Sequence, residues 1–183
     1  MALMHSTMVP LGTPAPDFSL PGTDDTIYSL SSFANAKALV VIFMCNHCPY
    51  VKAVLQRLID LQNELGPKGA QIVGINSNDA IRYPDDSMDA MKQCAAEKKI
   101  SFPYLFDETQ EIAKAYDALC TPDIFAYGPD RTLLYRGRID DNWKEPENIS
   151  QRNLRDAIEN ILSDKEVASE QIASMGCSIK WKS

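Results

Sequence analysis

The sequence predicts one mixed α/β domain in which helices cover both faces of a largely parallel sheet. Strands alternate with helices along most of the chain, one strand is apolar at every position, and the last two strands read as a hairpin. The chain has 183 residues, 45% of them hydrophobic, which is enough for one ordinary core. We expect a single domain over residues 1–183, with a core from about 10 to 162 and a tail over 163–183.

The first predicted elements are an N-terminal hairpin extension and a buried strand. Asp17–Leu20 and Thr26–Leu30 flank a Pro-Gly-Thr-Asp-Asp turn, and Ser31 or Ser32 then caps a short helical turn. Ala38–Met44 is apolar throughout, which is typical of a strand buried on both faces of a sheet.

A long amphipathic helix is predicted to begin at Pro49, because proline suits the first helical turn. Its apolar side chains recur every three or four residues up to a Gly-Pro stop: Val51, Val54, Leu55, Leu58, Leu61 and Leu65. The alternation then continues as a strand over 71–75, a helix over 87–98, a strand over 102–106, a helix from Asp107 through Leu119, strands over 123–127 and 132–139, and a helix from a Ser150 cap to about Leu162.

The overall charge and the cysteine count exclude several classes of protein. The formal net charge is -7 and no long basic run occurs, so neither nucleic acid nor an anionic membrane is an expected partner. Met1–Pro16 has no basic leader or apolar stretch of signal-peptide length, and we expect a cytoplasmic protein. Five cysteines, unevenly spaced, do not form a secreted disulfide framework.

Two of these cysteines lie at a predicted strand-to-helix junction, in the segment Cys45-Asn46-His47-Cys48. The N-terminus of a helix carries unpaired N–H groups and a partial positive charge, which favour an anion. Cys48 is therefore expected to ionise easily, and a thiolate is the form that attacks disulfides and peroxides. This hypothesis requires a sulfur that is not sealed in the protein interior.

Other residues near this motif have more than one interpretation. Cys45 is either a redox partner or a small core residue, and His47 either lowers the Cys48 pKa, orients Cys48 or faces solvent. Cys45, His47 and Cys48 together also offer soft ligands for copper or zinc. The Asp85-Asp86 pair lacks the spacing of a calcium loop and is interpreted as a solvated turn.

The order of the elements, the Cys-x-x-Cys before a helix and the later Thr-Pro together resemble the thioredoxin fold over about residues 10–162. The segments Gly-Thr-Pro-Ala-Pro-Asp-Phe-Ser-Leu at 12–20 and Leu-Ser-Ser-Phe at 30–33 are similar to the start of the alkyl hydroperoxide reductase/thiol-specific antioxidant (AhpC/TSA) branch, which contains the peroxiredoxins. Cys-Asn-His-Cys-Pro-Tyr-Val, Cys-Thr-Pro-Asp and Gly-Cys-Ser-Ile-Lys-Trp resemble a peroxiredoxin-like group within it.

The resemblance assigns the first active-site cysteine of the family to Cys48. Anchored there, the peroxiredoxin signature Pro-x-x-x-Thr-x-x-Cys has Cys45 at the Thr position and Val41 at the Pro position. Because the Thr hydroxyl helps to hold the peroxide in peroxiredoxins, the resemblance implies at most a weak peroxidase. Arg136 and Arg138 lie two residues apart on a predicted strand and are therefore expected on one face of it. An arginine such as Arg138 either holds the thiolate, as in peroxiredoxins, or pairs with Asp140 or Asp141.

Pro122 resembles the cis-proline that faces the active-site cysteine in thioredoxins, and Thr121 would then offer backbone groups to an extended substrate. Cys120 would lie near the site, and Cys177 lies in a tail where some peroxiredoxins keep a resolving thiol that comes from a neighbouring subunit. Cys45, Cys120 and Cys177 therefore all remain candidates to resolve Cys48.

The predicted function is that of a thiol-disulfide oxidoreductase or weak thiol peroxidase. Cys48 attacks a disulfide or peroxide, a second cysteine resolves the product, and thioredoxin or glutathione restores the thiols without an organic cofactor. The alternatives are a copper or zinc module and a non-enzymatic binding module that uses the groove beside Pro122. A homodimer is an oligomeric state that the resemblance allows.

Overall fold

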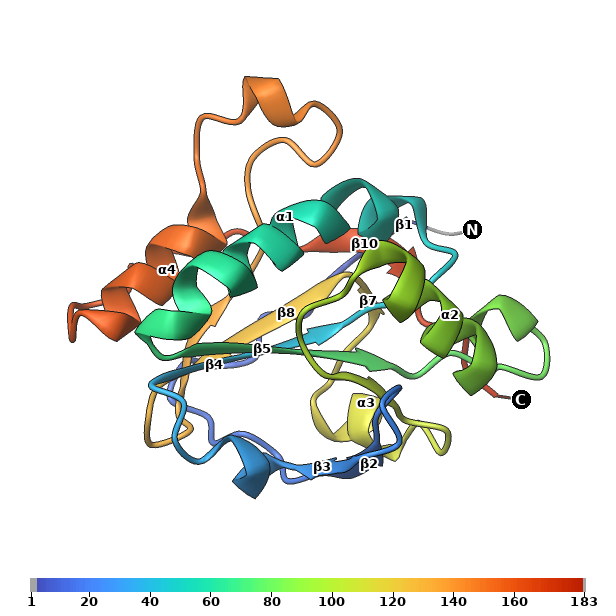
Figure 1. Cartoon of the computed structure of the whole chain (residues 1–183). Coiled ribbons are helices and arrows are strands. Elements are labelled where there is room, and N and C mark those ends of the chain that lie inside the picture. Colours follow the sequence, from blue (N-terminus) through green and yellow to red (C-terminus); the bar gives the residue numbers. More distant parts are fainter. Residues whose placement is uncertain (1–2, 183) are drawn as a thin grey trace.

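A five-stranded mixed sheet forms the centre of the protein in the computed structural model, which describes residues 3–182 (Figure 1). The strand order is β6-β5-β4-β8-β9. β4, β5 and β6 are parallel, whereas β8 and β9 extend the sheet in antiparallel fashion. The strands are β4 (Ala38–Phe43), β5 (Ala70–Asn76), β6 (Tyr104–Phe106), β8 (Asp123–Tyr127) and β9 (Leu133–Arg136). This arrangement confirms the predicted fold class.

Helices and a hairpin cover the two faces of this sheet (Figure 1). Val40 and Ile42 of β4 pack on the face covered by α1 (Pro49–Leu65), α2 (Met88–Lys98) and α4 (Asn153–Leu162). Val41 and Phe43 pack on the other face, against α3 (Glu111–Ala115) and the hairpin of β2 (Ser19–Pro21) and β3 (Ile27–Ser29). Short 3-10 helices occupy Leu30–Phe33 (η1), Gly66–Lys68 (η2), Pro84–Asp86 (η3) and Pro146–Asn148 (η4). Alternate residues of one apolar strand thus supply two cores.

A second, small sheet brings the two ends of the described chain together. β10 (Met175–Ser178) lies between β1 (Leu3–His5) and β7 (Cys120–Thr121), and both pairings are antiparallel. Figure 1 shows β1 and β10 beside the end of α1 at which that helix begins. The tail predicted after Leu162 therefore contains a strand.

The predicted bounds of three helices are wrong. The first helical turn, η1, is capped by Ser29 and not by Ser31 or Ser32. The helix expected from Asp107 through Leu119 is only α3, because Gln110 and Asp117 have positive φ angles of 65° and 54° and interrupt it on both sides. The Asp107 carboxylate still accepts a hydrogen bond from the Ala113 backbone N–H at 2.9 Å. It therefore stabilises the start of α3, as expected of a capping residue. The last helix has Arg152 at its N-cap instead of Ser150, whose hydroxyl donates to the Asp141 carboxylate.

No helix within residues 3–182 is both long and apolar enough to cross a membrane.

Candidate active site

Cys48 lies where the central strand passes into the first long helix. β4 ends at Phe43, the Met44 N–H still bonds to the Ile75 carbonyl at 2.8 Å, and Cys48 is the N-cap residue of α1 with φ -68° and ψ 122°. Pro49 follows at the first helical position, where no N–H is needed. The Cys48 carbonyl accepts the first helical hydrogen bond, from Lys52 at 2.9 Å.

The side chain of Cys48 is fully buried, with 0% of its surface exposed. The reactivity predicted from the sequence requires an accessible sulfur, and in this conformation the Cys48 sulfur is sealed in the interior. Thr121 and Cys177, on the two paired strands β7 and β10, both contact the Cys48 sulfur. An external substrate can reach that sulfur only if one of these covering segments moves.

The pKa of Cys48 is lowered to about 4, mainly because the Cys45 thiol donates a hydrogen bond to it. Burial opposes this shift, while the Thr121 side chain, the Val51 backbone N–H and the Cys177 thiol support it. The predicted direction of the shift thus agrees with the sequence analysis, but the leading cause is a neighbouring thiol and the helix terminus contributes less.

One contact of Cys48 favours its protonated form instead. The Cys48 sulfur lies 3.1 Å from the Thr121 carbonyl oxygen, to which a thiol can donate and a thiolate cannot. Ionisation therefore changes the partner of this sulfur from a carbonyl acceptor to the surrounding donors.

Cys45 is held as a neutral thiol. Its hydrogen bond to Cys48 and its burial raise its pKa well above the ordinary value, and the negative charge of Asp86 acts in the same direction. Its sulfur also lies 3.5 Å from the Thr121 hydroxyl. Of the two cysteines in the motif, Cys48 thus has the lower pKa, and Cys45 is the donor in their hydrogen bond.

The Thr121–Pro122 peptide bond is cis, as expected from the thioredoxin resemblance. The backbone groups of Thr121, which we expected to be offered to an extended substrate, pair with the strand β10, where Cys177 lies opposite Thr121. The chain itself therefore occupies the edge of β7.

The remaining cysteines lie at different positions around this site. Cys177 forms a side-chain hydrogen bond with Cys48, and burial and this bond raise its pKa to about 11. The Cys120 sulfur instead contacts the Pro122 carbonyl at 3.6 Å, and burial raises the pKa of Cys120 further. Cys94 lies half-buried on α2. Cys45 and Cys177 are the thiols that contact Cys48.

Asp86 anchors the loop that carries the two cysteines. Its fully buried carboxylate accepts the Asn46 N–H at 2.8 Å and lies 2.5 Å from Nδ1 of His47, whose ring stacks on Tyr83. Burial favours the neutral acid, but the hydrogen bonds from His47, Asn78 and Asn46 hold the pKa of Asp86 below its ordinary value.

The interpretation of Asp85-Asp86 as a solvated turn is thus wrong for Asp86. In the sequence, Asp86 is recognisable only as a carboxylate next to Ser87, which caps a helix. Its spacing does not indicate that it bonds to Asn46, 40 positions earlier. Asp86 also decides where His47 lies, since the His47 ring bonds to this carboxylate.

Three potential metal ligands converge at this anchor. Atoms of Cys45, His47 and Asp86 all lie within 4.8 Å of one another. The set differs from the Cys45, His47 and Cys48 set that the sequence suggested, because Asp86 takes the place of Cys48. Both Asp86 oxygens already accept hydrogen bonds from asparagine groups, at 2.8 Å from Asn46 N–H and 2.8 Å from Asn78.

The two arginines considered for the site have separate surroundings. Arg136 is fully buried, pairs with Asp123 and stacks on the Phe125 ring at 3.8 Å. Arg138 lies beyond the end of β9 and donates to Asn153 and Gln151, both at 2.9 Å. The expectation that the two share one strand face is therefore wrong, as is the alternative pairing of Arg138 with Asp140, because Arg57 takes that carboxylate.

Two cavities flank the buried thiols. One of about 220 Å³ is lined by Tyr50, Pro122, Arg138 and Trp143 among others, which places Arg138 beside the cis-proline. The other, of about 490 Å³ between α1 and α2, is lined by Cys45 and Cys94.

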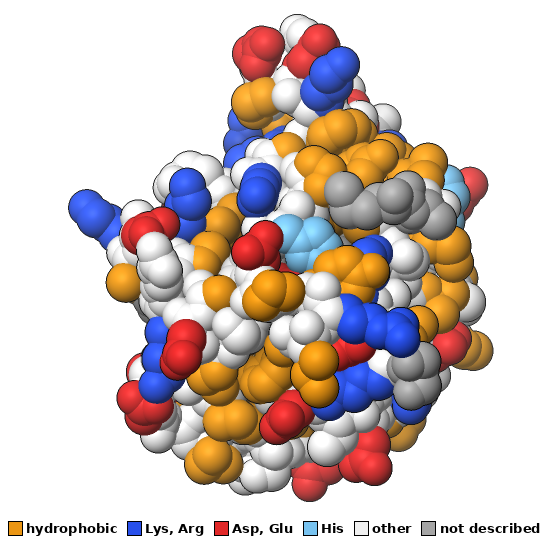
Figure 2. Space-filling model, turned by 90° about the vertical axis from the view of Figure 1, so that its right-hand side faces the viewer, with side chains coloured by type: hydrophobic (Ala, Val, Ile, Leu, Met, Phe, Trp, Pro, Cys, Tyr) orange, Lys and Arg blue, Asp and Glu red, His pale blue; other side chains and the backbone are white. Residues whose placement is uncertain are grey.

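On the face seen in Figure 2, histidine side chains reach the surface among mixed acidic, basic and apolar groups.

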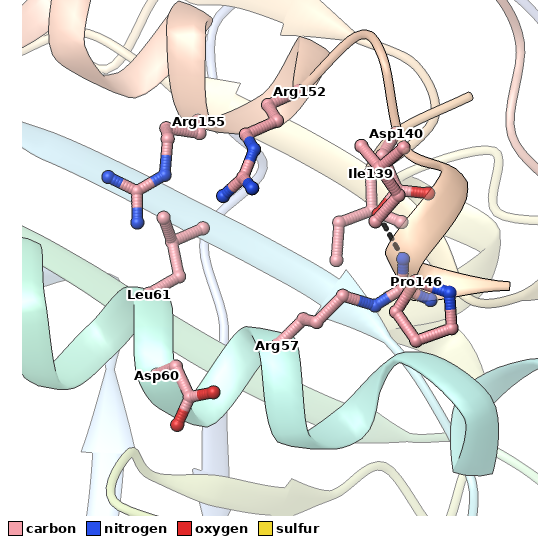
Figure 3. A pocket seen from close by; sticks show the side chains of 9 residues that line it. Arg57, Asp60, Leu61, Ile139, Asp140, Pro146, Arg152 and Arg155 are labelled. Atoms are coloured by element: carbon pink, nitrogen blue, oxygen red, sulfur yellow. Dashed lines mark hydrogen bonds and ion pairs between the residues drawn. The ribbon is translucent and has the colours of Figure 1, made fainter. Parts of the chain in front are cut away.

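A further cavity of about 250 Å³ lies between α1 and α4, apart from the cysteines. Figure 3 shows Arg57 of α1 paired there with Asp140, and Arg152 and Arg155 on the opposite side. Arg155 pairs with Glu64 and Glu159, so two of these three arginines already have carboxylate partners.

Residues 11–136 match the AhpC/TSA family. The chain belongs to this family. As an AhpC/TSA protein, it shares the thioredoxin-like fold of peroxiredoxins and thiol-disulfide oxidoreductases. A search of curated proteins gave no significant match.

Solved structures agree with this assignment. An uncharacterized conserved protein of Geobacillus kaustophilus is 45% identical, with a TM-score of 0.94 over 100% of this chain and 97% of the other. At 18% identity, a thiol:disulfide interchange protein of Chlorobium tepidum has a TM-score of 0.65, covering 85% of this chain and 99% of the other. Peroxidoxin BcpB of Mycobacterium tuberculosis, also 18% identical, has a TM-score of 0.58 over 84% and 94% of the two chains. The last two show the fold alone.

Proposed function

We propose that this AhpC/TSA protein is a thiol-disulfide oxidoreductase whose nucleophile is Cys48. The observation that carries the proposal is the hydrogen bond from the Cys45 thiol, which lowers the pKa of the N-cap Cys48 to about 4. At neutral pH the sulfur is then a thiolate once the cover has moved, which is the reactive form.

Disulfides are the preferred substrates over peroxides. In the family signature, the position of the peroxide-binding Thr is occupied by Cys45, whose thiol is engaged with Cys48 and Thr121. In the reaction, the Cys48 thiolate attacks one sulfur of the substrate, a mixed disulfide forms, and the other sulfur leaves as a thiolate. A second cysteine then attacks Cys48, and an external dithiol or glutathione restores the reduced protein.

The test is the reaction of the reduced protein with oxidised glutathione or hydrogen peroxide, followed by intact mass and peptide mapping between pH 5 and pH 8. We expect modification at Cys48 that remains fast at pH 5, because the thiolate persists down to a pKa of about 4. Cys48→Ser should abolish it. Cys94→Ser, which removes the half-buried thiol of α2, should leave the rate unchanged.

A Cys48 that reacts no faster than free cysteine at either pH contradicts the proposal. A protein in which Cys48→Ser retains the full rate contradicts it as well, because another thiol would then be the nucleophile.

Metal binding is a second candidate, favoured by the cluster of Cys45, His47 and Asp86. Thiolate, imidazole and carboxylate together suit zinc or copper. Metal content of the purified protein, and binding of cobalt followed by its thiolate charge-transfer band, test this function. A metal-free protein that binds no cobalt, or one in which Cys45→Ala and Asp86→Asn leave cobalt binding unchanged, contradicts it.

A further inference from the structure

We infer that β10 is a built-in substrate mimic, and that Cys177 is the residue that resolves oxidised Cys48. The inference rests on the proposed function, because it assumes that Cys48 is the nucleophile. It chooses among the three cysteines that the sequence left open.

β10 occupies the strand edge beside the cis-proline. β10 pairs antiparallel with β7 directly before the cis-proline, with Cys177 opposite Thr121 and Ser178 opposite Cys120. An extended polypeptide that binds by strand addition uses the main-chain groups of an open strand edge. β10 takes those groups on β7, so a substrate segment binding at this edge has to displace it.

The side chains of Cys48 and Cys177 are in direct contact. A hydrogen bond joins the two side chains. Cys177 is 2% exposed and Cys48 is 0% exposed, so both lie inside the same closed contact. The mimic therefore carries its own cysteine at the point where it meets the nucleophile.

The residue before Cys177, Gly176, packs directly against the backbone of β7. A side chain at Gly176 would place its Cβ 2.0 Å from the Thr121 carbonyl oxygen and 2.6 Å from its carbon. These are backbone atoms, which cannot move aside as a flexible side chain can. Glycine thus lets the backbone of β10 come close enough to β7 for Cys177 to meet Cys48.

Hydrogen bonds fix the chain on both sides of β10. Ser6 donates its N–H to the Ser174 carbonyl at 2.9 Å, and the Lys180 N–H donates to Asn78 at 2.8 Å. Gln110 donates to the Lys180 carbonyl at 2.8 Å. These anchors lie outside the four-residue strand, so they favour its return to the same register after displacement.

Cys45 has a different part in this scheme. It contacts Cys48 as well, but its thiol lowers the pKa of Cys48 as a donor and contacts the Thr121 hydroxyl at 3.5 Å. In this scheme Cys45 stays reduced and assists the thiolate, while Cys177 forms the disulfide.

With a hydroperoxide, the chemistry proceeds in two steps. With hydrogen peroxide, the Cys48 thiolate attacks one peroxide oxygen and the O–O bond breaks. The products are a Cys48 sulfenic acid and hydroxide, which is released to solvent and neutralised there by a buffer acid. The Cys177 thiol then attacks the Cys48 sulfur, the S–O bond breaks, and the hydroxyl leaves with the Cys177 proton as water. With a disulfide substrate, Cys177 instead displaces the substrate thiol from Cys48.

The experiment is disulfide mapping of the full chain after one equivalent of hydrogen peroxide, with dimedone present to trap sulfenic acid. We expect a Cys48–Cys177 disulfide and little dimedone adduct in the wild type. Cys177→Ser should raise the dimedone adduct on Cys48 at least tenfold. Cys177→Ala should give the same rise, which shows that the effect comes from loss of the thiol and not from a serine that disturbs the strand. Cys120→Ser, which removes a buried thiol from the neighbouring strand, is the matched control and should behave as wild type.

A second variant tests the strand without removing a thiol. Gly176→Ala should loosen β10, so Cys48 should react faster with oxidised glutathione while the Cys48–Cys177 disulfide forms more slowly. Oxidised Cys48 that joins Cys45 or Cys120, or stays as sulfenic acid in the wild type, overturns this inference alone. A Cys48 that none of these oxidants modifies overturns the proposed function itself.

Discussion

Cys45, Cys48 and Cys177 meet at the start of α1 and differ in how easily each thiol loses its proton. All three are nearly or fully buried, which by itself favours the neutral thiol in each of them. Cys48 is the exception because the donors around it, led by the Cys45 thiol, stabilise its negative charge. One anion surrounded by neutral donors is the arrangement expected of a nucleophile poised for attack.

Replacing that leading donor should make Cys48 harder to ionise. A hydrogen bond to a charged group contributes about 1.5–3 kcal/mol, so Cys45→Ala should move the ionisation midpoint of Cys48 up by about one to two pH units. Thiolate absorbance near 240 nm during a pH titration measures this without requiring access for a reagent. Cys94→Ala is the control, and an unchanged midpoint in Cys45→Ala would contradict the role given to Cys45.

Adjacent carboxylates at 85 and 86 offer a matched pair for testing the loop anchor. Asp86 is fully buried and bonded to His47 and Asn46, whereas the side chain of Asp85 is exposed. Asp86→Asn should lower the free energy of unfolding by about 2–4 kcal/mol, since a buried donor set loses its charged acceptor. Asp85→Asn should change it by less than about 0.5 kcal/mol. Urea denaturation measures both, and equal losses would contradict the anchor role.

At the scale of elements, regular periodicity was predictable and irregular geometry was not. The apolar run of β4 and the three- and four-residue spacing in α1 correctly indicated both elements and placed Cys48 at their junction. The helix after Asp107 was predicted too long because its interruptions depend on the φ angles of Gln110 and Asp117, which carry no strong sequence signal. β1 and β10 are short strands that pair only with distant segments, so local pattern does not indicate them.

The corner between β7 and β8 depends on one buried ion pair. Asp123 pairs with Arg136 of β9 and also accepts the Leu119 N–H at 3.0 Å, which connects the segment before the cis-proline to the sheet. Asp123→Ala leaves a fully buried arginine without its carboxylate and should cost about 3–5 kcal/mol of stability. Asp123→Asn should cost less, because it keeps an acceptor. Thermal and urea unfolding compare the variants, and equal stability of alanine and wild type would contradict the prediction.

Across the whole molecule, the lowered pKa of Cys48 links stability to pH. The folded pKa of about 4 lies below the unfolded value of about 8.5, so the unfolded chain binds more protons in between and stability rises with pH there. The advantage of wild type over Cys48→Ser should grow from pH 5 to pH 8 by at most about 1.4 kcal/mol per pH unit, and vanish as pH falls through 4. Urea denaturation across this range checks it, and a pH-independent difference would contradict it.

How much of the site could be predicted depends on how far apart its parts lie in the chain. Cys45 and Cys48 are neighbours in a motif, and Thr121-Pro122 carries a fold resemblance, so both were identified. Asp86 lies 38 positions after Cys48 in the sequence, and Cys177 lies 129 positions after it. Their contacts with the cysteine loop form only when the chain folds. The full burial of Cys48 was likewise not predictable, because its cover comes from the chain end.

The glycine at 176 has a consequence for mutational tolerance. Since any side chain there would enter the backbone of the facing strand, a saturation library selected for turnover should keep glycine at this codon. The same library should accept other residues at Gly66, where an added Cβ meets only the end of the flexible Gln62 side chain. Position 176 would then register as an essential site although it contributes no functional group of its own.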